Sequence, residues 1–206
     1  MAVHYSKDPR VNHSLRHSVR DALAFSVMSG AGETYFSAFA VFLRATTSQI
    51  ALLASLPPLL GSFAQLLSAW IARRRVRRRT MIVTGAAFQA LTWVPLLLLP
   101  VLFPRHAVPL LIACVTVYYA TAHFIAPQWI SLMGELVPER RRGRFFAHRT
   151  RVASITALAA LVGAGLILAL SQRLGHTLIG YMTIFTAAAA GRVVSTYHLA
   201  RMHEPE

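Results

Sequence analysis

Long apolar segments dominate this sequence and limit the folds available to it. Six such segments are separated by short polar or basic stretches, and each is close to the roughly 20 residues that a membrane-spanning helix needs. In hydrocarbon every backbone N–H and C=O group must be paired within the protein, and the segments show no period-two alternation typical of a barrel. We therefore predict an all-α, polytopic membrane protein with six transmembrane helices, at about residues 22–43, 46–71, 80–103, 107–133, 152–172 and 175–197.

The composition supports this reading, because 55% of the 206 residues are hydrophobic and only 14% are charged, which is too apolar for one soluble core. The predicted organisation is a cytoplasmic N-terminal segment over residues 1–21, a transmembrane bundle over residues 22–200 and a cytoplasmic tail over residues 201–206. The first twenty residues are polar and the following apolar run lacks a small-residue cleavage pattern, so we expect no removable signal peptide.

Basic residues are distributed very unequally between the two ends of these helices. Eighteen of the 21 Lys and Arg residues fall on the side that holds both termini, and only Arg44, Arg105 and Arg173 fall on the other. The positive-inside rule therefore predicts that both termini are cytoplasmic. The net charge of +14 is explained by this topology, and the lipid bilayer rather than nucleic acid is the expected partner.

Local signals refine the helices. Ser18 and Asp21 suit the start of the first helix, Pro57 and Pro58 predict a kink in the second, and Arg192 is expected to extend toward the cytoplasmic surface. The helix at residues 152–172 is rich in small residues, which either mediate close helix packing or only reflect a composition common in membranes.

Glu33 is the one formal charge inside the first predicted helix, where a charged side chain costs about 2.5–3.5 kcal/mol on insertion scales. Ser29 and Ser37 lie four residues to either side, which gives this helix a polar face. Glu33 either lines a translocation path, as a proton carrier or as the counter-charge of a cationic substrate, or is a protonated structural residue.

The fourth predicted helix carries a second polar face. Tyr119 and His123 lie on one side of it, with Tyr118 and Gln128 beside them. His123 either titrates or binds substrate, or it is a neutral histidine whose ring is satisfied by a carbonyl group.

Sites for other chemistry are lacking. His13 and His17 are four residues apart, but no further ligand stands at metal-binding spacing, so we expect no metal. Cys114 is expected to be a small buried residue. No Ser-His-Asp set, phosphate-binding glycine loop or paired carboxylates occur, so we expect neither an enzyme nor a cofactor.

Residues 136–149 read Leu-Val-Pro-Glu-Arg-Arg-Arg-Gly-Arg-Phe-Phe-Ala-His-Arg, which resembles the cytoplasmic loop between helices 4 and 5 of the major facilitator superfamily. With residues 32–35 and 57–67, the sequence is similar to a group of bacterial permeases over nearly its whole length. The resemblance implies the N-terminal half of a twelve-helix transporter, in which helices 1 and 4 line a central cavity and the halves alternate access to it.

Two loops carry the basic residues that the family uses for gating or topology. The family signature Gly-x-x-x-Asp-Arg-x-Gly-Arg-Arg is altered here, because residues 68–79 lack its aspartate and second glycine. The arginines therefore either contribute to gating or act only as a solvated topology signal. The candidate residues are Arg73, Arg77, Arg78, Pro138, Arg142, Gly143 and Arg144.

The function favoured by these observations is a half-length secondary transporter for a small solute, driven by a proton or solute gradient. It would act as a homodimer or with a separate C-terminal half, in a bacterial inner membrane. The alternative is a truncated or non-transporting membrane bundle with a structural or interaction role. An ion channel is disfavoured because the sequence has no filter-like loop.

Overall fold

The computed structural model describes residues 8–74 and 76–204, and within these residues the chain is all-helical, as predicted. Short 3₁₀ turns (η) separate some of the α-helices. The elements, in chain order, are α1 (Pro9–Ala31), η1 (Glu33–Tyr35), α2 (Phe36–Phe42), α3 (Thr47–Ala72), α4 (Arg78–Leu91), α5 (Trp93–Leu102), η2 (Pro104–His106), α6 (Ala107–Leu136), η3 (Glu139–Arg141), α7 (Arg142–Arg173) and α8 (Thr177–Ala200).

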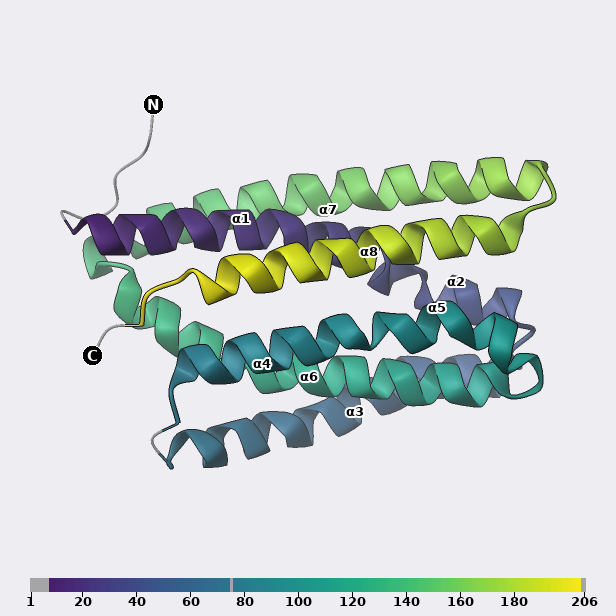
Figure 1. Cartoon of the computed structure of the whole chain (residues 1–206), viewed down its shortest axis with the longest axis horizontal. Helices are drawn as coiled ribbons and strands as arrows, with labels where there is room; N and C mark the ends of the chain where they lie inside the picture. The colour runs from purple at the N-terminus through teal and green to yellow at the C-terminus, as the bar shows by residue number, and fades with distance from the viewer. Residues whose placement is uncertain (1–7, 75, 205–206) are drawn as a thin grey trace.

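Five helical stretches in the described part of the chain are long and apolar enough to cross a membrane. The remaining predicted segment, residues 22–43, is divided between α1 and α2 and completes the six-helix bundle. Figure 1 shows these rods running side by side along the long axis of the molecule. The five stretches are Thr47–Ala72, Arg78–Leu102, Pro104–Leu136, Glu139–Arg173 and Thr177–Ala200.

The start of the first helix was predicted wrongly. The structure begins α1 at Pro9, where the side chain of Asp8 accepts a hydrogen bond of 2.7 Å from the backbone N–H of Arg10 and caps the helix. Ser18 and Asp21, expected at a helix start, lie inside α1 and are buried. Polar residues before position 22 therefore pack within the bundle, which a search for apolar runs cannot detect.

The first helix is also interrupted, at Gly32. A Cβ atom at this position would lie 2.3 Å from the ring of Trp93 and 2.6 Å from the side chain of Ala188, so only glycine fits. The chain continues as η1 and then α2. Glu33 consequently lies in a 3₁₀ turn between two helices, and its predicted position in the middle of one continuous helix is wrong.

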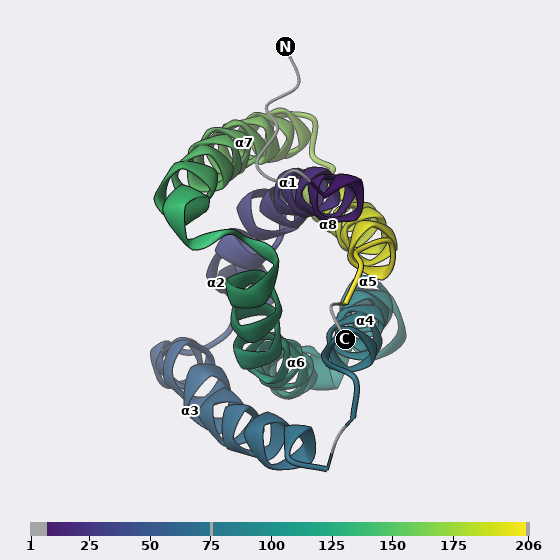
Figure 2. The ribbon, with the colours of Figure 1, turned by 90° about the vertical axis from the view of Figure 1, so that its left-hand side faces the viewer.

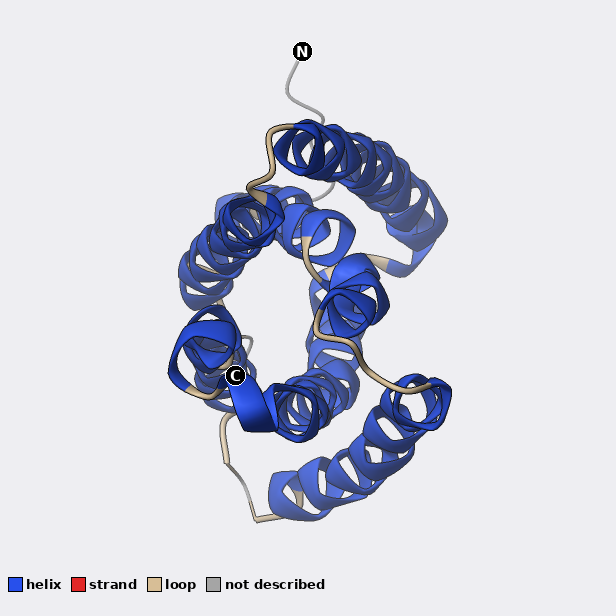
Figure 3. Ribbon diagram, turned by 90° about the vertical axis from the view of Figure 1, so that its right-hand side faces the viewer, coloured by secondary structure: helices blue, strands red, loops and turns tan. Residues whose placement is uncertain are grey.

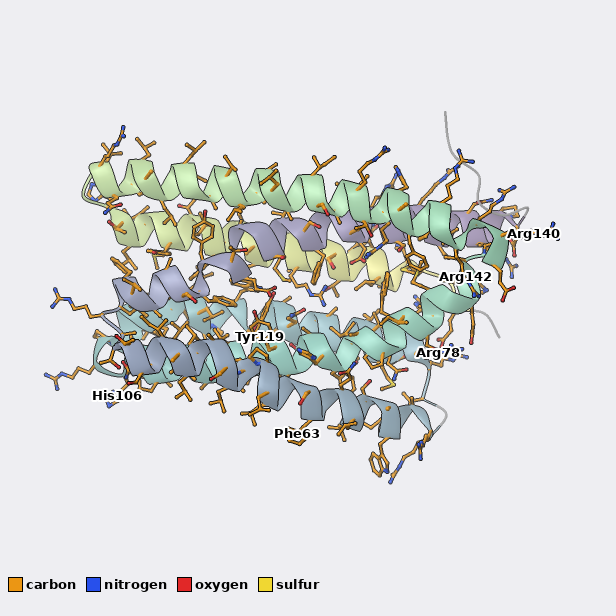
Figure 4. The ribbon with its side chains drawn as sticks, turned by 180° about the vertical axis from the view of Figure 1, so that it is seen from behind. Phe63, Arg78, His106, Tyr119, Arg140 and Arg142 are labelled. Atoms are coloured by element: carbon orange, nitrogen blue, oxygen red, sulfur yellow. The ribbon has the colours of Figure 1, made fainter. Side chains whose placement is uncertain are left out.

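Other helix ends also differ from the predicted limits. α7 begins at Arg142, ten residues before position 152, and the predicted helix at residues 80–103 is divided at Thr92 into α4 and α5. α3 is one helix across Pro57 and Pro58, and its axis bends in its middle (Figure 4).

Viewed from either end, the helices form a curved assembly in which α3 and α7 lie farthest apart (Figures 2 and 3). α3 packs mainly on α6, and α7 packs mainly on α1. Arg78, Arg140 and Arg142 gather at one end of the bundle and His106 lies at the other (Figure 4). We call the first of these the basic end.

The small residues of α7 pack on one face only. A Cβ atom at Gly30 of α1 would lie 2.3 Å from the backbone oxygen of Ala157, so the two helices approach closely there, and Ala164 is buried. Gly163 has open space around it. Most of the remaining surface of α7 is exposed, as is most of α3.

Candidate functional site

Glu33 accepts hydrogen bonds from two tyrosines of α6. The hydroxyl of Tyr118 donates to Oε2 at 2.9 Å, and the hydroxyl of Tyr119 donates to Oε1 at 3.0 Å. The carboxylate is half-buried, because the turn η1 directs it toward α6 between the two helical pieces. Each oxygen thus has a phenolic donor, an arrangement suited to a charged carboxylate in a poorly hydrated site.

Aromatic rings enclose one side of this site. Tyr118 is 1% exposed, and the rings of Phe36 and Trp93 lie 5.3 and 5.6 Å from its ring, centre to centre. The side-chain amide of Gln89 donates to the backbone oxygen of Tyr118 at 3.3 Å. These contacts fix the inner tyrosine, whereas Tyr119 is only partly buried. Figure 4 labels Tyr119 near the centre of the bundle.

The serines predicted beside Glu33 are not held against it. Because the helix is broken at Gly32, Ser37 no longer follows Glu33 by one regular helical turn, and its side chain is exposed. Ser29 is half-buried, and its backbone oxygen accepts a hydrogen bond from Thr34. The predicted polar face therefore contributes Glu33 itself to the site, while the described contacts do not include either serine.

Residues on the second predicted polar face separate into two groups. Tyr119 contacts Glu33, but His123 lies against α3, where a Cβ atom at Gly61 would be 2.8 Å from its ring. Gln128 is buried and donates to the hydroxyl and backbone oxygens of Ser68 at 3.1 and 3.2 Å. The geometry of His123 and Gln128 therefore joins α6 to α3.

A network at the basic end connects three parts of the chain. Arg78 donates to both carboxylate oxygens of Glu135 at 2.7 Å. The carboxylate of Glu204 accepts from the backbone N–H of Arg78 at 2.8 Å, which caps the start of α4. The loop signature lacks its aspartate, and α6 and the segment after α8 supply carboxylates to Arg78 instead.

The other basic-end candidates have fewer contacts. Arg142 donates to the backbone oxygen of Val137 at 3.2 Å and lies 3.7 Å from Glu139. Pro138 precedes η3, and a Cβ atom at Gly143 would meet no atom within 4 Å. Arg73, Arg77 and Arg144 are exposed.

One group of charged residues was missed by the sequence analysis. Asp21 accepts from Arg149 at 3.0 Å and from Ser195 at 2.7 Å, and Arg192 donates to Ser195 at 2.9 Å. The prediction that Arg192 extends to the surface is wrong, because the residue is 2% exposed. The available signal was the position of Asp21 and two arginines near the same end of three helices.

The histidines near the basic end do not assemble a metal site in the described part of the chain. The rings of His13 and His17 lie 4.5 Å apart, centre to centre, and His17 Nδ1 is 3.0 Å from His198 Nδ1. No group of three His, Cys, Asp or Glu residues suited to holding a metal occurs within residues 8–74 and 76–204.

Comparison with known proteins agrees with this architecture. The family profile of the Major Facilitator Superfamily matches residues 22–204, which is most of the chain and includes Glu33 and both tyrosines. A comparison with curated proteins finds no match.

Proposed function

Because this integral membrane protein belongs to the major facilitator superfamily of transporters, we propose that it moves a small solute across the membrane by alternating access. Glu33 is the centre of the proposed site, as a proton carrier or as the counter-charge of a cationic group on the solute. The chain would work as one half of the transporter, paired with a second copy or with a separate C-terminal half.

The observation that carries the proposal is the pair of hydrogen bonds from Tyr118 and Tyr119 to Glu33. A carboxylate inside a membrane protein is costly, and such residues are typical of ion and substrate pathways. A substrate ammonium group could pair with the same oxygens, while a proton would turn one acceptor oxygen into a donor and change the contact with its tyrosine.

The exposed surfaces of α3 and α7 support a role for a second bundle. Of the most apolar stretch of each helix, only 17% of residues in α3 and 6% in α7 are buried within this chain. Apolar side chains such as Phe63 on α3 and Ile155 on α7 are more than half exposed. A second six-helix unit packed against these helices would complete a cavity beside Glu33. The resemblance to bacterial permeases favours a bacterial inner membrane, and the distribution of basic residues favours cytoplasmic termini.

The test is transport by reconstituted protein, with and without a co-expressed C-terminal half. Compounds are screened in proteoliposomes that contain a pH-sensitive dye and are subjected to an imposed proton gradient. We expect Glu33→Gln to lower the transport rate at least about tenfold, because it removes the charge while keeping an acceptor oxygen for a tyrosine.

Glu139→Gln is the matched control, since the side chain of Glu139 is 85% exposed at the basic end. It is expected to transport at the wild-type rate. Wild-type rates and unchanged pH dependence in Glu33→Gln would exclude Glu33 from the mechanism.

A further inference from the structure

The buried group of Asp21, Arg149, Arg192 and Ser195, here called the Asp21 cluster, joins α1, α7 and α8. Asp21 receives hydrogen bonds from Arg149 Nη2 and from the Ser195 hydroxyl, at 3.0 and 2.7 Å. Both Asp21 and Arg192 are at most 3% exposed. One side-chain carboxylate therefore lies among two guanidinium groups.

Arg192 shares the single carboxylate of Asp21 with Arg149, which forms the closer pair with it. Its Nη1 donates to Ser195, its guanidinium lies 5.3 Å from the centre of the Phe25 ring, and its buried Nε has no hydrogen-bond partner. Within residues 8–74 and 76–204, Asp21 forms its ion pair with Arg149, and Arg192 has no carboxylate at ion-pair distance. Two guanidinium groups thus share one carboxylate in a buried cluster, and the excess positive charge favours an additional negative charge at this site.

A cavity of about 300 Å³ adjoins the cluster. It is lined by Asp21, Arg149 and Arg192 together with mainly apolar residues from α1, α6 and α8. Among the described residues, the buried indole N–H of Trp129 finds no hydrogen-bond partner, and the ring of Trp129 packs under the Arg149 guanidinium at 4.3 Å. Two unused donors, Arg192 Nε and Trp129 Nε1, thus belong to residues that line one cavity.

We propose that this cavity binds a small organic anion with one carboxylate and an apolar body. The carboxylate would accept hydrogen bonds from Arg192 and Trp129 and balance the second guanidinium charge, while apolar side chains such as Phe25 and Ile125 would contact the body. Water could satisfy the two donors but would leave the charge unbalanced. The volume is at the lower limit for ligand sites, which favours a compound about the size of benzoate.

The remaining unpartnered atom of the cavity suggests one more feature of the ligand. Gln89 donates through its amide nitrogen to the backbone oxygen of Tyr118, and its buried Oε1 has no partner. An acceptor in this position would pair with a hydroxyl group on the apolar body. The site is separate from the Glu33 carboxylate, and ligand binding to it does not require that the chain transports anything.

The experiment measures binding of sodium benzoate to the full chain in nanodiscs, by calorimetry and by the rise in the unfolding temperature with ligand concentration. Benzamide, which has nearly the same shape without the charge, is the control ligand. We expect saturable binding of benzoate and at least tenfold weaker binding of benzamide. Equal binding of both compounds, or binding of neither, would overturn the proposal.

Two variants test the donors. Arg192→Gln is expected to raise the dissociation constant for benzoate at least about tenfold, the usual effect of losing a charged hydrogen bond. Arg151→Gln removes a positive charge from an exposed position of the same helix as Arg149 and should bind like the wild type. Wild-type affinity in folded Arg192→Gln would contradict the assignment.

If Arg192→Gln fails to fold, Trp129→Phe decides the question, because it removes only the indole donor and keeps an aromatic ring. A severalfold loss of benzoate affinity supports the site, and an unchanged affinity overturns it.

Discussion

At the scale of single residues, the site depends on how differently its two tyrosines are held. Both tyrosines belong to α6, but Tyr118 is almost fully buried among aromatic rings, whereas Tyr119 is partly accessible. The outer phenol can therefore leave Glu33 with less rearrangement than the inner one. The hydrogen bond from Tyr119 to Glu33 is therefore the one expected to break first when a proton or a cation binds the carboxylate.

A double-mutant cycle measures the coupling between Tyr119 and Glu33. We expect Tyr119→Phe and Glu33→Leu to be coupled by about 0.5–3 kcal/mol of unfolding free energy, because the first substitution has little further effect once the carboxylate is absent. Thermal or denaturant unfolding in a mild detergent provides the measurement. Tyr197→Phe, at a side chain that is 52% exposed on α8, is the control and should be additive with Glu33→Leu.

His17 gives the chain a dependence on pH near the basic end. Burial, followed by the neighbouring His13, lowers the pKa of His17 from 6.5 to about 4. The unfolded chain therefore binds a proton at this residue below pH 6.5, while the folded chain does so only near pH 4. The titration of His17 therefore does not change the free energy of unfolding above pH 6.5, and it lowers that free energy as the pH falls from 6.5 toward 4.

We expect the unfolding temperature of the wild type to fall between pH 6.5 and pH 4, and the fall to be smaller in His17→Asn. Unfolding followed by circular dichroism across this range is the measurement. His106→Asn, at an exposed residue at the opposite end of the bundle, should keep the wild-type slope. A wild-type slope in His17→Asn would exclude His17 as its source.

At the scale of the helices, the lengths of the apolar runs and the charges between them located the six segments but not their ends. The polar residues from Pro9 to Asp21 continue α1 beyond the apolar run, and Trp93 and Ala188, from distant parts of the chain, pack so closely on position 32 that only glycine fits where α1 ends. The helix start has a local signal in Asp8 and Pro9, whereas the close packing at Gly32 has none. The position of an acidic residue, Glu33, within an apolar run was visible in the sequence, while its two phenolic donors and the burial of Arg192 required the tertiary structure.

Two glycines test how tightly α1 and α7 are packed. Gly30→Ala would place a Cβ atom 2.3 Å from the backbone oxygen of Ala157, and we expect it to destabilise the protein by about 1–3 kcal/mol through overpacking. Gly163→Ala is the control on α7, because its Cβ atom would meet no atom within 4 Å. It should be neutral or stabilising by up to about 1 kcal/mol in the same unfolding assay. Equal stabilities would contradict the close approach.

At the scale of the whole molecule, the exposed faces of α3 and α7 allow the association of two copies to be tested by disulfide crosslinking. Single cysteines at Phe63 and Ile155, introduced in a Cys114→Ser background, should form disulfide-linked dimers in membranes if two copies associate through these helices. Phe88→Cys is equally exposed on α4, a helix that packs mainly on α6 and α8, and it should stay monomeric. Crosslinks at Phe88 alone would place the interface elsewhere. Crosslinks at none of the three positions would favour a separate partner chain.

The hydrogen bonds divide the bundle into two blocks of helices, one with α1, α7 and α8 and the other with α3, α4 and α6. The Asp21 cluster ties α1, α7 and α8 together, and contacts such as Gln128 to Ser68 tie α6 to α3. Polar links between the blocks gather at Glu33, in the interior, and at Glu204, at the basic end. Releasing the Glu33 bonds alone would leave the blocks joined at the basic end. At the other end the blocks stay joined by the chain that runs from α2 into α3 and by the apolar core that α2, α5, α6 and α8 share, so separating them would also require that core to open.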